Sequence, residues 1–212
     1  MYYLFLHRSN ALFLVLFLLL TTTAKADSPL TSTEFYKAYQ DVAIVKIAMG
    51  SEGKATLPIL EYLDNEKNLI DIKMAVINAL GWNYDGLHNA ELYYSHVNRN
   101  NTFSSIEDFS LNGRPDQRLC YAYLLAMDNY FDVITAATIA NDVASLEKTA
   151  KSYTYNMIAA LINAQLTMEY DWCEVYHITN NVRQNTTLKK DFRMAAIPLI
   201  FEYMDLYAES CD

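Results

Sequence analysis

The sequence contains little glycine and little proline, with five glycines and four prolines among 212 residues. Sandwiches and barrels of β-strands need frequent turns, and these two residues build most such turns. Apolar residues instead recur every three or four positions along most of the chain, a spacing typical of amphipathic helices. Together, the scarcity of turn residues and this spacing predict an all-α fold.

The chain also lacks the motifs of the common catalytic and metal-binding sites. It contains no glycine-rich phosphate loop, no Gly-x-Ser-x-Gly, no His-Glu-x-x-His, no EF-hand loop and no Cys-x-x-Cys. One Glu-x-x-His pair, Glu174 and His177, has the order found in di-iron helical bundles, but those bundles need a second pair. We therefore predict no metal, no cofactor and no enzymatic activity.

Positive charge is scarce as well. Lys and Arg number 16 against 25 Asp and Glu, which gives a net charge of −9. Nucleic acids are bound by Lys and Arg side chains that displace counterions, so an acidic chain argues against a nucleic-acid partner. The same charge argues against anionic membranes, and it fits a basic protein partner or simply a soluble surface.

One long apolar run stands near the N-terminus, where residues 11–20 read ALFLVLFLLL. Arg8 precedes the run, and Ala24-Lys25-Ala26 follows it as a small-x-small site. This order is that of a secretory signal peptide, and the run is shorter than the roughly 20 residues of a membrane span. We expect residues 1–26 to be cleaved. Residues 27–212 should then form a single helical domain in the periplasm or outside the cell, without a membrane anchor.

Three cysteines are present, Cys120, Cys173 and Cys211, which is fewer than a disulfide scaffold uses. An odd number in an oxidising compartment allows one bridge and one free thiol, or no bridge. A bridge between Cys173 and Cys211 would fasten the C-terminal tail, and Cys120, in an apolar segment, is expected to be an inert packed thiol. Asn-x-Thr sequons at Asn100 and Asn185 leave a eukaryotic secretory route open beside a bacterial periplasm.

Residues 56–82 show a regular two-helix pattern. A leucine-rich helix ends in an Asp-Asn turn, and a second helix opens with Asp71-Ile72-Lys73 and closes with Ala79-Leu80-Gly81. This pattern resembles a HEAT repeat unit, with Val76 where that family usually has alanine. The resemblance implies antiparallel helix pairs stacked into an α-solenoid.

Two other segments resemble the second helix of this unit, Asp191–Ile200 and, more weakly, Asp116–Leu125. Asp71 and Asp116 are about 45 residues apart, within the HEAT period of roughly 40–47 residues. The sequence therefore predicts either a short HEAT-like α-solenoid or an irregular bundle of antiparallel helix pairs. The expected helices cover residues 33–49, 57–63, 71–80, 87–97, 116–130, 132–140, 142–165 (continuous or broken), 169–178 and 190–207, with a long loop over 98–114 that includes one helical turn at 106–109.

A compact group of aromatic and polar residues follows the HEAT-like unit. Tyrosine is abundant in this chain, with 17 copies, and it is enriched in recognition surfaces. The turn after the unit also contains a tryptophan, a histidine and a glycine that interrupts the helix. We predict that the partner-binding residues are Trp82, Tyr84, Asp85, His88, Tyr93 and Tyr94.

These features favour a secreted protein-binding domain over an enzyme. In general character the chain resembles small acidic periplasmic immunity proteins. The resemblance implies an inhibitor that neutralises a basic toxin or a cell-wall-targeting effector. Two alternatives stay open: an envelope protein that self-associates as a homodimer through tyrosine-rich faces, and a hydrolase that uses Asp85 and His88.

Overall fold

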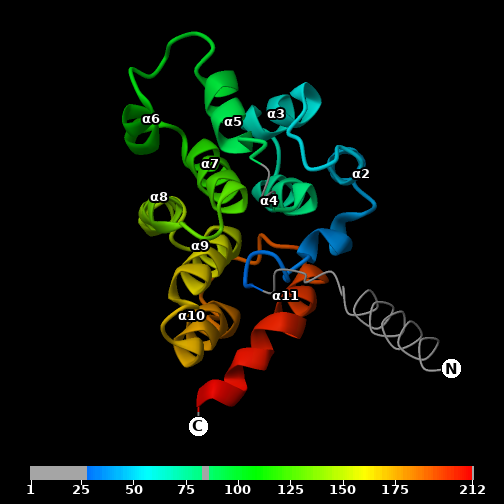
Figure 1. Ribbon diagram of the computed structural model, residues 1–212, viewed down its shortest axis with the longest axis vertical. Coiled ribbons are helices and arrows are strands. Elements are labelled where there is room, and N and C mark those ends of the chain that lie inside the picture. The colour runs from blue at the N-terminus through cyan, green and yellow to red at the C-terminus, as the bar shows by residue number, and fades with distance from the viewer. Residues whose placement is uncertain (1–27, 83–85, 212) are drawn as a thin grey trace, which may run out of the picture.

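A computed structural model describes residues 28–82 and 86–211 of the chain (Figure 1). The expected signal peptide, residues 1–26, lies outside the described residues. Those residues form no β-strand and only one isolated bridge, so the predicted all-α fold is confirmed. None of their helices combines the length and hydropathy that crossing a membrane requires. The elements are η1 (Phe35–Tyr39), α2 (Ala43–Met49), α3 (Leu57–Asp64), α4 (Ile70–Leu80), α5 (Asn89–Val97), α6 (Ile106–Asn112), α7 (Pro115–Asp128), α8 (Ile134–Ser145), α9 (Tyr153–Thr167), α10 (Trp172–Gln184), α11 (Ala196–Met204) and η2 (Asp205–Cys211).

Local sequence signals set several helix ends. Ser105, Ser152 and Asp171 each accept a hydrogen bond from a backbone N–H three residues further on, which satisfies one of the free donors at a helix start. Pro115 occupies the first position of α7, where its missing N–H costs nothing. Gly81 ends α4 with a φ of +73°, a conformation that glycine adopts without strain.

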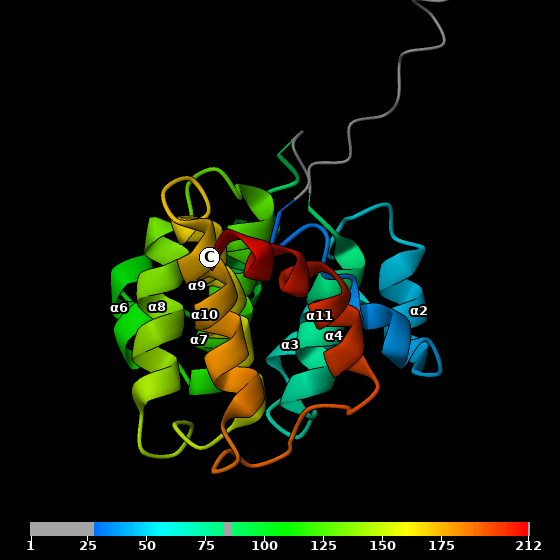
Figure 2. The ribbon, with the colours of Figure 1, turned by 90° about the horizontal axis from the view of Figure 1, so that it is seen from below.

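The helices pack around one core. Helices α7, α8, α9 and α10 pack on one another in chain order, and α4 packs against η1, α2 and α7 (Figure 2). At the end of the chain, α11 returns to η1. Phe192, just before α11, packs its ring against those of Phe35, Tyr39 and Tyr153.

This return of α11 bears on the choice between the two predicted architectures. Each repeat of a solenoid contacts only its neighbours, so its two ends lie apart. Here the guanidinium of Arg193, shortly before α11, lies over the Tyr39 ring and pairs with Asp41. Contact between the first and last parts of the described chain favours the irregular bundle.

Helix α11 begins at Ala196, so the predicted start at residue 190 is wrong, and the repeat-like segment Asp191–Ile200 is not one continuous helix. The carboxylate of Asp191 accepts a hydrogen bond from the backbone N–H of Thr154 at 3.0 Å, and its carbonyl accepts one from the Thr154 hydroxyl. These bonds hold Asp191 at the start of α9 instead. Pro198 also fits better in the first turn of a helix than in its interior, where it would remove a hydrogen bond.

Other boundaries differ in smaller ways. The expected helix over 33–49 divides into η1 and α2. The segment 142–165, which was predicted as continuous or broken, is broken at residues 146–152, where the buried Thr149 hydroxyl donates to the Val143 carbonyl. Residues 106–112 form the complete helix α6, where only one turn at 106–109 was expected. Glu107 and Asp108 lie in its first turn, where carboxylates offset the helix dipole.

Candidate functional site

The predicted turn after α4 is only partly within the described residues. Trp82 is half-buried and packs edge-on against Tyr130, with ring centroids 5.2 Å apart. His88 is exposed just before α5 and has a left-handed φ of 51°. Tyr84 and Asp85 lie outside the described residues. The structure thus places Trp82 and His88 at one end of the bundle.

Tyr93 and Tyr94 on α5 face inward. Tyr93 has no exposed surface, its hydroxyl donates to the Leu63 carbonyl at 3.4 Å, and burial raises its pKa well above the ordinary value. Tyr94 is half-buried, its ring lies 5.5 Å from that of Phe109, and its hydroxyl accepts a hydrogen bond from Asn98. Tyr93 must therefore be removed from the predicted binding surface, because it is a core residue.

An exposed apolar cluster that the sequence did not predict lies near Trp82. Phe131 and Ile134, just before and at the start of α8, are 65% and 63% exposed. Tyr170 and Trp172, just before and at the start of α10, are 83% and 58% exposed. The first three line a cleft of about 290 Å³. The Trp172 indole N–H donates at 2.8 Å to the carbonyl of Met168, which lines the same cleft. We call Phe131, Ile134, Tyr170 and Trp172 the apolar patch.

Aromatic contacts extend the apolar patch on both sides. The Tyr130 ring, which Trp82 contacts, lies 4.2 Å from the Phe131 ring. On the other side, Trp172 packs edge-on against Tyr207 of η2 with centroids 6.2 Å apart. Large apolar patches are uncommon on monomeric surfaces, and Trp and Tyr are the residue types that most often carry binding energy.

Carboxylates border the apolar patch. Asp132 and Glu169 line the cleft itself, and Asp171 and Glu174 flank Trp172 along the chain. All four are exposed, and none forms an ion pair with a residue in the ranges 28–82 and 86–211. We call these four residues the acidic rim. An apolar centre with a charged edge is the usual layout of a protein–protein interface.

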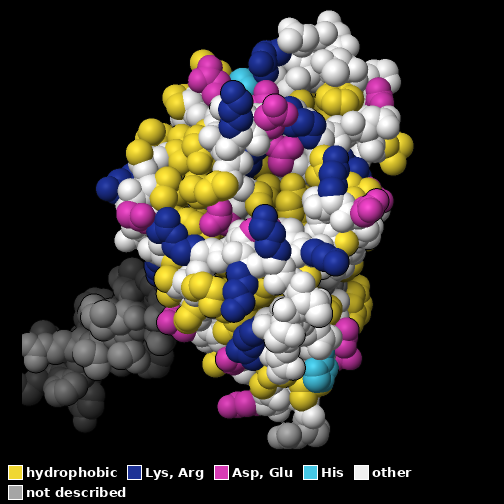
Figure 3. All heavy atoms as spheres, turned by 180° about the vertical axis from the view of Figure 1, so that it is seen from behind, with side chains coloured by type: hydrophobic (Ala, Val, Ile, Leu, Met, Phe, Trp, Pro, Cys, Tyr) yellow, Lys and Arg dark blue, Asp and Glu magenta, His cyan; other side chains and the backbone are white. Residues whose placement is uncertain are grey.

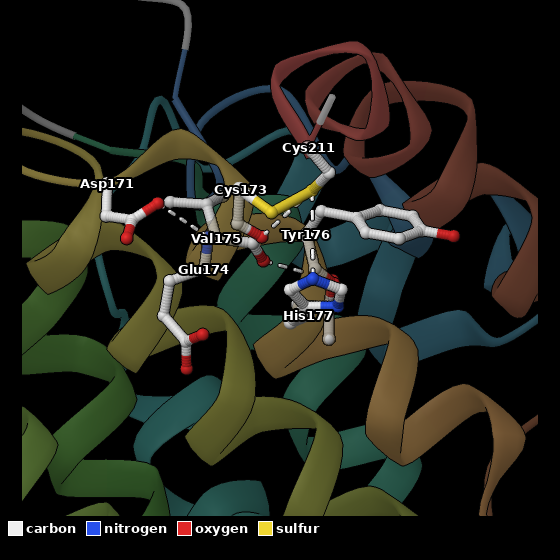
Figure 4. The surroundings of a disulfide bond; sticks show 8 residues. Asp171, Cys173, Glu174, Val175, Tyr176, His177 and Cys211 are labelled. Carbon is white, nitrogen blue, oxygen red and sulfur yellow. Dashed lines mark hydrogen bonds between the residues drawn. A yellow bond between two sulfur atoms is a disulfide. The ribbon is translucent and has the colours of Figure 1, made fainter.

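A disulfide bond lies close to this surface. Cys173, next to Trp172, is bonded to Cys211, with Cα atoms 4.7 Å apart, and the bond fastens η2 to the start of α10 (Figure 4). The Nε2 atom of His177 lies 3.8 Å from the Cys211 sulfur. The three side chains are near enough to share a metal ion, but sulfurs in a disulfide are not the thiolates that bind metals. We therefore assign the bond a structural role, that of holding η2 beside Trp172.

No protein-family model, curated protein or solved structure matches this chain. The described fold and surface define a class: an all-helical domain with an exposed apolar patch bordered by exposed carboxylates.

Proposed function

We propose that the mature chain is a secreted or periplasmic, non-catalytic domain that binds another protein through the apolar patch. The observation that carries this proposal is the exposure of four large apolar side chains, three of which line one cleft. Burying such a side chain stabilises a structure by about 1.5–3 kcal/mol. In the free domain most of this apolar surface stays in contact with water. A partner that covers the patch would bury it, and the complex would be stabilised by the free energy of that burial.

The acidic rim supports a partner of positive charge. Complementary charge speeds association and disfavours wrong partners. Two copies of this domain that met patch to patch in a symmetric dimer would bring two acidic rims together, which counts against the homodimer. The partner that best fits is a basic toxin or cell-wall-targeting effector, which the domain inhibits by covering its surface.

Co-purification with the product of the adjacent gene tests this function. We expect residues 27–212 to form a complex with a Kd of about 1 μM or tighter, a free energy of about −8 kcal/mol, and to suppress the activity of the partner. Light scattering of the domain alone should give a monomer at high concentration. A dimer would favour self-association instead, and no complex at micromolar concentration would contradict the inhibitor function.

Substitutions in the apolar patch should weaken this complex without unfolding the domain. Replacing Tyr170 and Ile134 together with alanine is expected to raise the Kd by at least about 30-fold, because buried interface anchors carry about 2 kcal/mol or more. Leu69 and Leu111, 65% and 71% exposed outside the patch, provide a matched double alanine control. Calorimetric titration compares the two proteins, and equal losses in both would show that the patch is not the interface.

A further inference from the structure

A second cleft lies at the other end of α8 and α9 from the apolar patch, and it has a volume of about 400 Å³. Figure 2 shows that the connectors before α9 and before α11 reach the same end of the bundle. Figure 3, which views that side, shows Lys and Arg side chains gathered across it, although the chain carries a net charge of −9. Residues that line the cleft include Arg114, Asp116, Lys148, Lys151, Tyr155 and Lys189.

Backbone hydrogen bonds fix the positions of the lysines. The N–H of Lys189 donates to the Lys151 carbonyl at 2.6 Å, and the N–H of Tyr153 donates to the Lys189 carbonyl at 3.1 Å. Lys148 lies on the turn after α8, and the buried hydroxyl of the next residue, Thr149, donates a hydrogen bond to the Val143 carbonyl near the end of that helix. We call Lys148, Lys151 and Lys189 the lysine triad. Two connectors distant in sequence therefore hold three positive charges around one cleft.

The lysine triad has no direct ion-pair partner in the part of the chain that the structure describes. None of the three side chains forms an ion pair or a hydrogen bond with a described residue. Two carboxylates of the cleft have other partners, because Asp116 accepts from Lys73 and Asp191 accepts from Thr154. The third carboxylate, that of Glu66, is exposed and pairs with no lysine. The three ammonium groups therefore have no ion-pair partner among the described residues and remain available to an anionic ligand.

A phenol adds an uncharged donor to the cleft. Tyr155 is only 8% exposed, and its hydroxyl has no hydrogen-bond partner among the described residues. The Tyr153 hydroxyl oxygen is fully buried and has no hydrogen-bond partner among the described residues. The Tyr155 hydroxyl oxygen keeps some exposed surface, and it faces the cleft that Tyr155 lines. Burial, aided by the charges of Asp116 and Asp191, raises the pKa of Tyr155 well above the ordinary value, which keeps the proton available for donation.

We propose that this cleft binds a small molecule that carries a phosphate or diphosphate group, held by the lysine triad and the Tyr155 hydroxyl. Lysine ammonium groups act as point charges toward phosphate, and the oxygens of one phosphoryl group can accept from several donors at once. The volume is within the roughly 300–1,000 Å³ of small-molecule sites. The cleft shares no residue with the apolar patch or the acidic rim, so its test is independent of the proposed protein binding.

Titration calorimetry with inorganic pyrophosphate at low ionic strength tests the proposal. We expect one site per chain, with an affinity that falls as salt is added. Citrate, an anion of comparable charge without phosphorus, should bind at least about tenfold more weakly, a difference of about 1.4 kcal/mol. Absence of binding at millimolar pyrophosphate would overturn the site, and equal affinity for citrate would overturn its assignment to phosphate.

Three variants separate a defined site from general attraction. Lys189→Ala should weaken pyrophosphate binding about tenfold or more, and Tyr155→Phe, which removes only the hydroxyl, should weaken it about fivefold. Lys190→Ala is the matched control, because Lys190 is an exposed neighbour outside the cleft lining, and it should change the affinity less than twofold. Equal effects at Lys189 and Lys190 would overturn the proposal.

Discussion

Replacing Asp116 with alanine is expected to reduce the free energy of unfolding by about 3–5 kcal/mol. Lys73 on α4 is fully buried, and its Nζ atom lies 2.6 Å from the Asp116 carboxylate in the first turn of α7. No other described residue accepts a hydrogen bond from the Lys73 side chain. The substitution therefore leaves an uncompensated charge inside the protein. Urea denaturation at pH 7 measures the loss.

Replacing the lysine of this pair, instead of the aspartate, should reduce the free energy of unfolding far less. In Lys73→Met, Asp116 keeps two hydrogen bonds from Arg114, at 3.1 and 3.2 Å, and the volume of the buried side chain is conserved, so we expect a loss below about 1.5 kcal/mol. The double variant should resemble Lys73→Met more than the sum of the single changes. Glu34→Ala, which breaks the exposed pair with Lys37, serves as the control and should cost about 1 kcal/mol or less. Equal losses for Asp116→Ala and Glu34→Ala would contradict the argument.

The same carboxylate sets an expected response to acid. Burial raises the pKa of Asp116, but hydrogen bonds from Arg114 and Lys73 outweigh it and hold the pKa below the ordinary value. A carboxyl with a lower pKa in the folded state stabilises fully above its unfolded pKa, near 4, and that stability is lost as the pH falls through the folded pKa. The difference in unfolding free energy between wild type and Asp116→Asn should therefore be largest at neutral pH and shrink below about pH 4. A difference that stays constant down to pH 2.5 would assign the effect to packing.

The all-helical fold could be predicted because apolar spacing and capping residues act within a few positions of the chain. Gly81 is an example, since it ends α4 for a reason visible in the local sequence. The start of α11 could not be predicted in this way. Its position depends on Asp191, which is held by Thr154 at the start of a helix packed elsewhere in the fold. The lysine triad escaped prediction for the same reason, because the bridge between its two connectors is a tertiary contact.

The candidate site also contains residues that local sequence could place and residues that only tertiary packing brings together. Ala90, Tyr93 and Val97 follow the i, i+3, i+7 spacing of one helix face, and all three are buried, so periodicity already indicated that Tyr93 belongs to the core. The apolar patch offered no comparable signal. Phe131 and Tyr170 lie in two short connectors that look like ordinary turns, and only the antiparallel packing of the helices brings them to one cleft. Exposed aromatic residues in connectors can therefore be recognised as one binding surface only when the packing of the helices is known.

Removal of the Cys173–Cys211 disulfide is expected to lower the free energy of unfolding by about 2–4 kcal/mol, because the bond closes a loop of 38 residues and so restricts the unfolded chain. The double variant Cys173→Ser, Cys211→Ser should match the wild type treated with a thiol reductant. Cys120 does not confuse this comparison, since it is buried and burial raises the pKa of its thiol to about 12. Equal stability with and without reductant would show that side-chain packing alone holds η2.

The effect of this disulfide on binding should differ between the two ends of the molecule. Without the bond, η2 can move away from α10, and the contact of Tyr207 with Trp172 loses its tether. Partner binding through the apolar patch should then weaken, because a less ordered surface loses more conformational entropy when it binds. Pyrophosphate binding at the lysine triad should be unchanged, since α8 and α9 separate that cleft from the bond. Weakening of both to the same degree would mean that the disulfide supports the whole bundle rather than the apolar patch.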